Sequence, residues 1–233
     1  YKALMSSIRS FGGEILCNSP VVLIRNSNDK KICLHTQEAS MEFDLIISTI
    51  PSPLFQSIWR ELSDQETSYQ SPPYYLGIIC VALILRRSLS PFYLTNLIQK
   101  GFPFTGIVEM TNVIDRHEAT RDYHLVFLPR YDISESEWFE KDPDDITVGF
   151  LTSLRDIWPM IDQDIVGTVV HREKYFQPLW PPGYYPSATA TLNLNGNVAL
   201  INAELIKQDT HNNNATVKIA NQAADYLTAR SIG

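Results

Sequence analysis

The sequence has few cysteines, and their spacing matches no metal or redox motif. Cys17, Cys33 and Cys80 are the three cysteines among 233 residues, and each lies in apolar, strand-like sequence. An odd number of widely spaced cysteines is typical of buried reduced thiols and disfavours a disulfide framework. Neither C-x-x-C nor H-E-x-x-H occurs, and we therefore expect no metal site.

Long apolar runs and an excess of basic charge are missing as well. The longest apolar candidate, residues 74–85, has the length of a strand, whereas a membrane-spanning helix needs about 20 apolar residues. The 19 Lys and Arg against 26 Asp and Glu give a net charge of −7, which disfavours nucleic acid and anionic membranes as partners. We expect a cytoplasmic protein without a transmembrane segment, and the sequence leaves its oligomeric state open.

Glycine loops that bind phosphates are also absent. Neither G-x-G-x-x-G nor G-x-x-x-x-G-K-[ST] occurs, so no complete nucleotide-binding loop is encoded. The nucleophile motif G-x-S-x-G is missing too, and we assign no catalytic residue. The chain begins Tyr1-Lys2-Ala3-Leu4 without an initiator Met or a leader-like segment. We therefore expect it to be a piece of a longer protein.

The first 62 residues carry the pattern of alternating helices and strands. An apolar helical face in residues 2–11, followed by Gly12-Gly13, predicts a helix and its stop. Residues 21–24 and 31–35 flank a turn-rich segment and predict a hairpin. The apolar run at residues 44–50 predicts a strand covered on both faces.

Ser52 and Pro53 then have the residue types of an N-cap and a first helical position. They predict a short helix that ends near residue 62. Near the other end of the chain, residues 197–201 predict a short strand and residues 215–227 an Ala-rich helix.

The middle of the chain has the pattern of a sheet covered by a helix. Ser134 and Glu137 have the spacing of a capping box. Asp142 and Pro143 open a helical pattern that lasts until Pro159, and this helix is expected to cover one face of the sheet. The strands are expected at residues 74–85, 92–98, 106–110, 123–128 and 166–176.

These patterns together predict an α+β protein. Residues 1–55 and 191–233 are expected to be two segments of one α/β domain. Residues 56–190 are expected to form a mixed-sheet domain with flanking helices, inserted between those segments.

Several segments then resemble one known family, and together they cover essentially the whole chain. They are Gly12-Gly13-Glu14-Ile15 with residues 18–24, the "D-x-V-I-x-x-x-P"-like residues 44–51, the middle pieces 92–96, 103–109 and 177–180, and the terminal pieces 196–201 and 214–215. In this order they resemble the flavin-containing amine oxidase superfamily, particularly its bacterial protoporphyrinogen-oxidase-like members.

The resemblance implies an FAD-binding domain, a substrate-binding domain and a small-molecule substrate. It implies that the backbone at Val21 contacts the FAD adenine and that Glu204, Asn214 and Ala215 lie at the flavin. A helix starting near Asn213 would present free N–H groups to such a cofactor. The alternative is that the asparagines at 212–214 are only a helix cap and loop.

The sequence departs from the family pattern at three places. Asn202-Ala203-Glu204 stands where the family has Ala-Gly-Asp or Ala-Gly-Glu, and Ala220 replaces a helix glycine. Both changes add a side chain where the backbone would approach the flavin closely. Ile79 aligns with a lysine of true amine oxidases, which disfavours oxygen-dependent amine oxidation. A weakened or lost cofactor site is the alternative that follows.

Polar and aromatic residues of the middle section are the candidates for contact with substrate. Glu109 lies in an apolar strand, where it would have a perturbed pKa or be an exposed surface glutamate. Arg130 would bind a substrate carboxylate or phosphate, or form a surface salt bridge. The aromatic candidates would line a ligand or pack at the domain junction. The full set of substrate-binding candidates is Tyr93, Asn96, Glu109, Arg130, Trp180 and Tyr184.

The function implied for the intact protein is that of an FAD-dependent oxidoreductase. A hydride would pass from the substrate to flavin N5, and the substrate domain would supply orientation and exclude water. We expect the 233 residues alone to be inactive. Two alternatives stay open: a flavin-dependent sugar-nucleotide mutase, and a non-catalytic descendant that only binds a ligand or partner.

Overall fold

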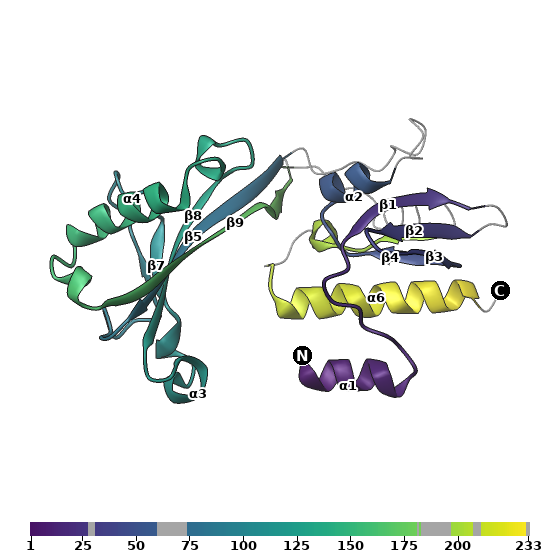
Figure 1. The fold of residues 1–233 in the computed structure, drawn as a ribbon, viewed down its shortest axis with the longest axis horizontal. Helices are drawn as coiled ribbons and strands as arrows, with labels where there is room; N and C mark the ends of the chain where they lie inside the picture. Colours follow the sequence, from purple (N-terminus) through teal and green to yellow (C-terminus); the bar gives the residue numbers. More distant parts are fainter. Residues whose placement is uncertain (28–30, 60–73, 181, 183–196, 207–210, 232–233) are drawn as a thin grey trace. The chain divides into compact units, whose positions relative to one another are not determined.

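The computed structural model describes residues 1–27, 31–59, 74–180, 182, 197–206 and 211–231. Helices and several sheets make it an α+β fold, as the sequence patterns predict (Figure 1). The chain divides into two compact units. Unit 1 comprises Tyr1–Ser71 and Gly183–Gly233, and unit 2 comprises Pro72–Pro182. None of the described helices is long and apolar enough to cross a membrane.

Unit 1 contains two small sheets around one apolar core. Its first sheet is antiparallel, in the order β1 (Val21–Asn26), β2 (Ile32–Thr36) and β3 (Ser40–Phe43). Its second sheet pairs β4 (Ile46–Ser48) with β10 (Val198–Leu200) in parallel. The core consists of buried apolar side chains from both sheets and from helix α2, namely Ile24, Ile32, Ile46, Phe55, Trp59, Val198 and Leu200.

The helices of unit 1 differ in how much they bury. α1 (Lys2–Ser10) buries no residue, and it ends before Gly12, whose φ of +80° is a left-handed conformation that glycine adopts without strain. α2 (Ser52–Ile58) buries Ser52 and Phe55. The short 3-10 helix η4 (Ala203–Leu205) and the long α6 (Asn213–Ser231) follow β10.

Unit 2 is a five-stranded sheet with helix α4 on one face (Figure 1), and all its strand pairs are antiparallel, so the predicted mixed sheet is wrong. The strand order is β6 (Leu94–Asn96), β7 (Gly106–Glu109), β8 (His124–Ile133), β5 (Tyr74–Leu85) and β9 (Ile165–Leu179). α4 (Pro143–Arg155) buries Ile146, Phe150 and Leu154 against the alternate side chains of β5 that begin with Ile79. The Asp142 carboxylate accepts a hydrogen bond from Asp144 N at 2.8 Å, so the predicted N-cap is confirmed.

Short helices occupy the connections of unit 2. They are η1 (Met110–Asn112), α3 (Arg116–Thr120), η2 (Glu137–Phe139) and η3 (Ile161–Gln163). The predicted capping box of Ser134 and Glu137 is wrong, because the cap of η2 is Ser136, whose hydroxyl accepts from Trp138 N.

Three further predictions need correction. Ser52 is the first residue of α2 and Pro51 its N-cap, because the Ser52 hydroxyl bonds a distant carboxylate and is not free to cap the helix. Ile47 in β4 is 49% exposed, so that strand is not covered on both faces. Cys17 is exposed, while Cys33 is buried and Cys80 half-buried.

Two strands of unit 2 also differ in length from the predicted ones. The strand predicted at 92–98 shortens to β6, and the strand predicted at 123–128 extends as β8 through Pro129 to Ile133. Pro129 is accommodated opposite Cys80 in the ladder between β8 and β5. β3 and α3 were not predicted. The helix predicted to reach residue 62 ends at Ile58 within the described part, and residues 60–73 lie outside it.

Candidate functional site

A small hollow lies where the parallel strands β4 and β10 end. Thr49 follows β4, and Ile201 and Asn202 follow β10, so the carboxyl ends of both strands reach the hollow. Ala203, Thr216 and Ala220 line it as well, and its volume is about 220 Å³. The carboxyl ends of parallel strands are where open α/β sheets bind ligands. This hollow is therefore the candidate cofactor site of unit 1.

Glu204 beside this hollow is buried and bonded inward. Its Oε1 accepts hydrogen bonds from Ser52 N at 2.9 Å and from the Ser52 hydroxyl at 2.6 Å. Ser52 is fully buried and Glu204 is 2% exposed. Burial raises the pKa of the Glu204 carboxyl, although the two hydrogen bonds from Ser52 act in the opposite direction. Glu204 therefore joins α2 to the loop after β10.

Asn202 holds the same loop in place. Its side-chain amide donates to the Ile50 carbonyl at 2.9 Å, and its side-chain oxygen accepts from Glu204 N at 3.0 Å. Asn202 and Glu204 thus connect the loop after β10 to Ile50 and Ser52, which follow β4.

The start of α6 is capped by the protein itself. The Asn212 side-chain oxygen accepts from Ala215 N at 3.0 Å, and the Asn212 carbonyl accepts from Thr216 N. Ala215 is 3% exposed and Asn214 is exposed. One of the N–H groups expected to face a cofactor is therefore already bonded. His211 precedes this cap, and burial lowers its pKa, with a backbone hydrogen bond at Ile206 opposing that effect.

Val21 lies on the other sheet of unit 1. It begins β1 opposite Thr36, and its side chain packs against the core of the unit. The ladder between β1 and β2 shifts register directly after Val21. Val21, Glu204, Asn214 and Ala215 remain predicted cofactor contacts, carried by different sheets and loops.

In unit 2, the face of the sheet opposite α4 is mainly apolar and partly exposed. Residues paired across neighbouring strands share a face, and the row Leu94, Val108, Phe127, Ala82 and Val169 runs across all five strands. Leu94 and Val169 are 48% and 47% exposed. This open sheet face, which that row defines, is the candidate substrate surface.

The predicted substrate residues divide between the two faces of this sheet. Asn96 pairs with Gly106 and shares the open sheet face with Leu94. Glu109 pairs with Val126 and Arg130 with Ile79, so both lie on the face that α4 covers.

Glu109 is buried, and the expectation of an exposed surface glutamate is wrong. It is 1% exposed, and its Oε2 accepts from Leu89 N at 3.2 Å and Ser90 N at 3.1 Å. Its Oε1 lies 3.3 Å from His124 Nδ1, and His124 Nε2 is in turn bonded to the guanidinium of Arg116. Glu109 thus fixes the connection between β5 and β6. Tyr93 joins the same region through its carbonyl, which accepts from Glu109 N at 2.8 Å.

Arg130 forms an internal ion pair. Its Nη2 lies 2.7 Å from Asp132 Oδ2, and its guanidinium stacks 4.3 Å from the centre of the Trp138 ring. The pKa of Asp132 is lowered by hydrogen bonds from Arg130 and Ser136, against an opposing effect of burial that is the largest single contribution. Trp180 is half-buried, and Tyr184 lies outside the described residues.

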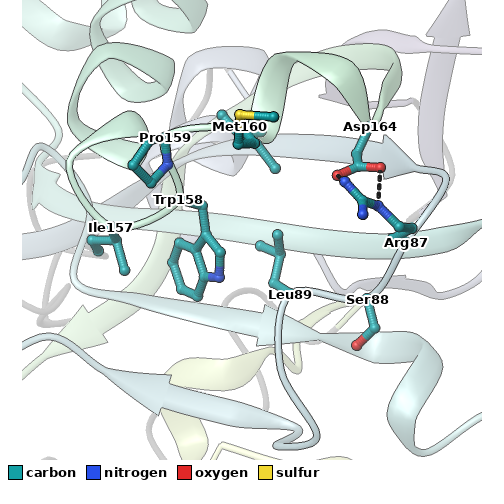
Figure 2. A pocket seen from close by; sticks show the side chains of 9 residues that line it. Arg87, Ser88, Leu89, Ile157, Trp158, Pro159, Met160 and Asp164 are labelled. Atoms are coloured by element: carbon teal, nitrogen blue, oxygen red, sulfur yellow. Dashed lines mark hydrogen bonds and ion pairs between the residues drawn. The ribbon is translucent and has the colours of Figure 1, made fainter.

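A second hollow in unit 2 was not predicted. It has a volume of about 310 Å³, and its lining includes Arg87, Leu89, Trp158 and Met160 (Figure 2). The sequence signal that was available is Trp158-Pro159-Met160, a run of large apolar residues just after a helix end. Among the described residues, no cluster of three His, Cys, Asp or Glu side chains has the arrangement of a metal site.

Solved structures provide the comparisons for this chain. No protein-family model matches it, and no curated protein matches it. A candidate protoporphyrinogen oxidase from Exiguobacterium sp. 255-15 is similar over 96% of this chain and 51% of its own, with 13% identity and a TM-score of 0.65. An oxidoreductase from Methanosarcina mazei is similar over 87% of this chain and 47% of its own, with 14% identity and a TM-score of 0.54.

A reduced UDP-galactopyranose mutase is a third similar structure. It matches 76% of this chain and 39% of its own, with 11% identity and a TM-score of 0.57. The chain therefore spans about half the length or less of these solved proteins. At these identities the likeness concerns the fold, which is one found in oxidoreductases and in a sugar-nucleotide mutase.

Proposed function

We propose that the chain is the substrate-binding part, with flanking cofactor-domain segments, of an FAD-dependent oxidoreductase. The observation that carries this proposal is the hollow at the carboxyl ends of β4 and β10, built by segments about 150 residues apart. The solved oxidoreductases of similar fold support it, as does the resemblance to flavin-containing amine oxidases. FAD would supply hydride acceptance at its ring, which is chemistry that no protein side chain offers.

The residues around the hollow fit one edge of a flat ring system. Ala203, Ala220 and Thr216 are small and leave the space open, while Ile201 and Ile206 give it apolar walls. Neither Glu204 nor the N–H of Ala215 is free to hold a phosphate, because the first bonds Ser52 and the second bonds Asn212. The residues that line the hollow would therefore hold the ring of the cofactor. Its phosphates would be bound by other parts of the intact protein.

The open sheet face of unit 2 would bind and orient the substrate. Its half-buried apolar side chains, among them Phe127 and Ile78, exclude water from whatever they cover. Asn96 offers this face an amide that both donates and accepts hydrogen bonds. An apolar face with few polar groups favours a largely apolar substrate whose orientation depends on a small number of hydrogen bonds.

The test is the flavin content of the intact protein and of one matched pair of variants. Ala220→Trp fills the hollow, while Ala224→Trp places the same ring one turn further along α6, outside it. We expect purified full-length protein to carry FAD or to take it up, with the visible spectrum of a bound flavin. We expect Ala220→Trp to lose the flavin and Ala224→Trp to keep it. An intact protein that cannot be reconstituted with FAD would refute the proposal.

A second candidate is a sugar-nucleotide mutase that uses reduced flavin without net oxidation. The similar fold of the reduced UDP-galactopyranose mutase is the observation that favours it. The discriminating measurement is the affinity of the flavin-loaded protein for a nucleotide sugar before and after reduction with dithionite. Tighter binding to the reduced protein supports the mutase, whereas bleaching of the flavin by a reducing substrate supports the oxidoreductase.

A further inference from the structure

The hollow of Figure 2 lies in unit 2, at the end of β5 far from the residues where the chain enters and leaves the unit. Two segments build it. The first follows β5 and contributes Arg87, Ser88 and Leu89, and the second follows α4 and contributes Trp158 and Met160. Its volume of about 310 Å³ is near the lower limit of about 300 Å³ for small-molecule sites.

The walls of this hollow are held by hydrogen bonds within unit 2. The buried carboxylate of Glu109 accepts from the backbone N–H of Leu89 and of Ser90. Trp158 N donates to the Leu154 carbonyl at 2.9 Å, which fixes the turn after α4. Arg86 N donates to the Asp164 carbonyl at 2.8 Å and ties the two segments together. A ligand would therefore meet a preformed site, with little ordering cost.

Large apolar side chains stay exposed in the hollow although a closed core lies beneath them. Met160 is 58% and Ile157 37% exposed, whereas neighbouring Ile161 is 1% exposed. Figure 2 shows the Trp158 ring beside Leu89, with Met160 and Pro159 on the same rim. An indole ring and a thioether are the side chains that pack well against a flat aromatic body.

The polar end of the hollow carries an ion pair between Arg87 and Asp164. Arg87 Nε and Nη2 donate to the two oxygens of Asp164 at 2.7 and 3.0 Å. Hydrogen bonds from Arg87 lower the pKa of Asp164, with Arg86 adding to the effect and burial opposing it. The carboxylate of Asp164 thus uses both oxygens to bind two of the three nitrogens of the Arg87 guanidinium. The Nη1 atom of Arg87 has no acceptor among the described residues, so it remains available to an anion.

We propose that this hollow binds a small aromatic carboxylate, with its flat body against Trp158 and Met160 and its carboxylate at Arg87. Because the lining is mainly apolar and one end carries a guanidinium, the ligand needs an apolar body and an anionic group. The site involves none of the residues assigned to the cofactor or to the open sheet face. It would therefore act as a ligand site of unit 2 that is independent of flavin binding.

The experiment titrates the full chain with cinnamate and, separately, with its neutral amide, by calorimetry and by backbone NMR shifts. We expect saturable binding of cinnamate, with shifts centred on residues 87–89 and 157–161. Arg87→Gln should weaken cinnamate binding about tenfold, which is about 1.4 kcal/mol, and leave binding of the amide unchanged. Arg155→Gln is the matched control, because Arg155 makes the same two-pronged pair with Asp162 outside the hollow.

A second pair of variants tests the site at an exposed position, where folding is not at risk. Met160→Glu places a carboxylate on the rim of the hollow and should abolish cinnamate binding by charge repulsion, while Met160→Gln removes only the thioether contact and should weaken binding much less. The absence of saturable binding at millimolar cinnamate would overturn the proposal. Equal weakening by Arg87→Gln and Arg155→Gln, or equal effects of the two Met160 variants, would overturn it as well.

Discussion

The buried pair of Glu204 and Ser52 allows a stability prediction with a defined sign at each pH. Ser52 gives two hydrogen bonds to one oxygen of Glu204, at 2.9 and 2.6 Å. Ser52→Ala removes the hydroxyl and keeps the backbone donor. A hydrogen bond to a charged group contributes about 1.5–3 kcal/mol, so we expect the free energy of unfolding at neutral pH to fall by about 2 kcal/mol.

Glu204→Gln is expected to behave differently. The amide oxygen of glutamine accepts from the same two donors, while the charge whose burial raises the Glu204 pKa is gone. The free energy of unfolding at neutral pH should therefore be unchanged or higher, within about 1 kcal/mol. Ser52→Ala combined with Glu204→Gln forms a double-mutant cycle that measures the coupling of the pair.

The dependence on pH follows from the raised pKa of Glu204. Its value is above the 4.5 of the unfolded chain, so the folded protein binds the proton more tightly. This contribution to stability is fully present below the unfolded pKa and is lost as the pH rises through the folded pKa. The Glu204→Gln variant should not show this decrease in the free energy of unfolding as the pH rises. Urea unfolding followed by circular dichroism at a series of pH values measures the free energy of unfolding. If its dependence on pH is the same for the parent and for Glu204→Gln, the reasoning is refuted.

Three further predictions concern unit 2. Gly77→Ala places a Cβ against the Phe139 ring and 2.9 Å from the Glu173 carbonyl oxygen, and it should lower Tm at a cost of about 1–3 kcal/mol. Gly149→Ala meets no atom within 4 Å and should raise Tm. Burial raises the pKa of the Cys80 thiol to about 11, so iodoacetamide at pH 8 should label exposed Cys17 first, and equal labelling rates would contradict this. Glu109→Ala should lower the unfolding free energy by about 2 kcal/mol by leaving two partly buried N–H donors unpaired, and Glu109→Gln should restore most of that loss in urea titrations.

The elements predicted well are those with local signals. β5 has the predicted bounds, because its 12 residues are an unbroken apolar run between polar segments. α4 begins where predicted, because Asp142 and Pro143 are strong start signals for a helix. β3, in contrast, has only four residues, of which three are exposed, and it exists because β2 offers it a hydrogen-bonding edge.

The site features that escaped prediction depend on partners far away in the sequence. The burial of Glu109 follows from its position opposite β8, which brings it to His124, and strand register is a long-range property. The pairing of Ser52 with Glu204 spans 152 positions. The polar end of the second hollow joins Arg87 to Asp164 across 77 positions. Each of these residues has the sequence context of an ordinary polar residue, so composition and spacing give no signal for the pairing.

The antiparallel pairing of β5 and β9 has a consequence for the order in which the chain folds during synthesis. Tyr74 pairs with Leu179, so unit 2 begins and ends at neighbouring residues and closes as soon as β9 has been made. β4 cannot pair until β10 has been synthesised, because Ile46 pairs with Val198. Domains generally fold as units while the ribosome is still working. Unit 2 therefore folds before the second segment of unit 1 has been synthesised, and the hollow of unit 1 is assembled last.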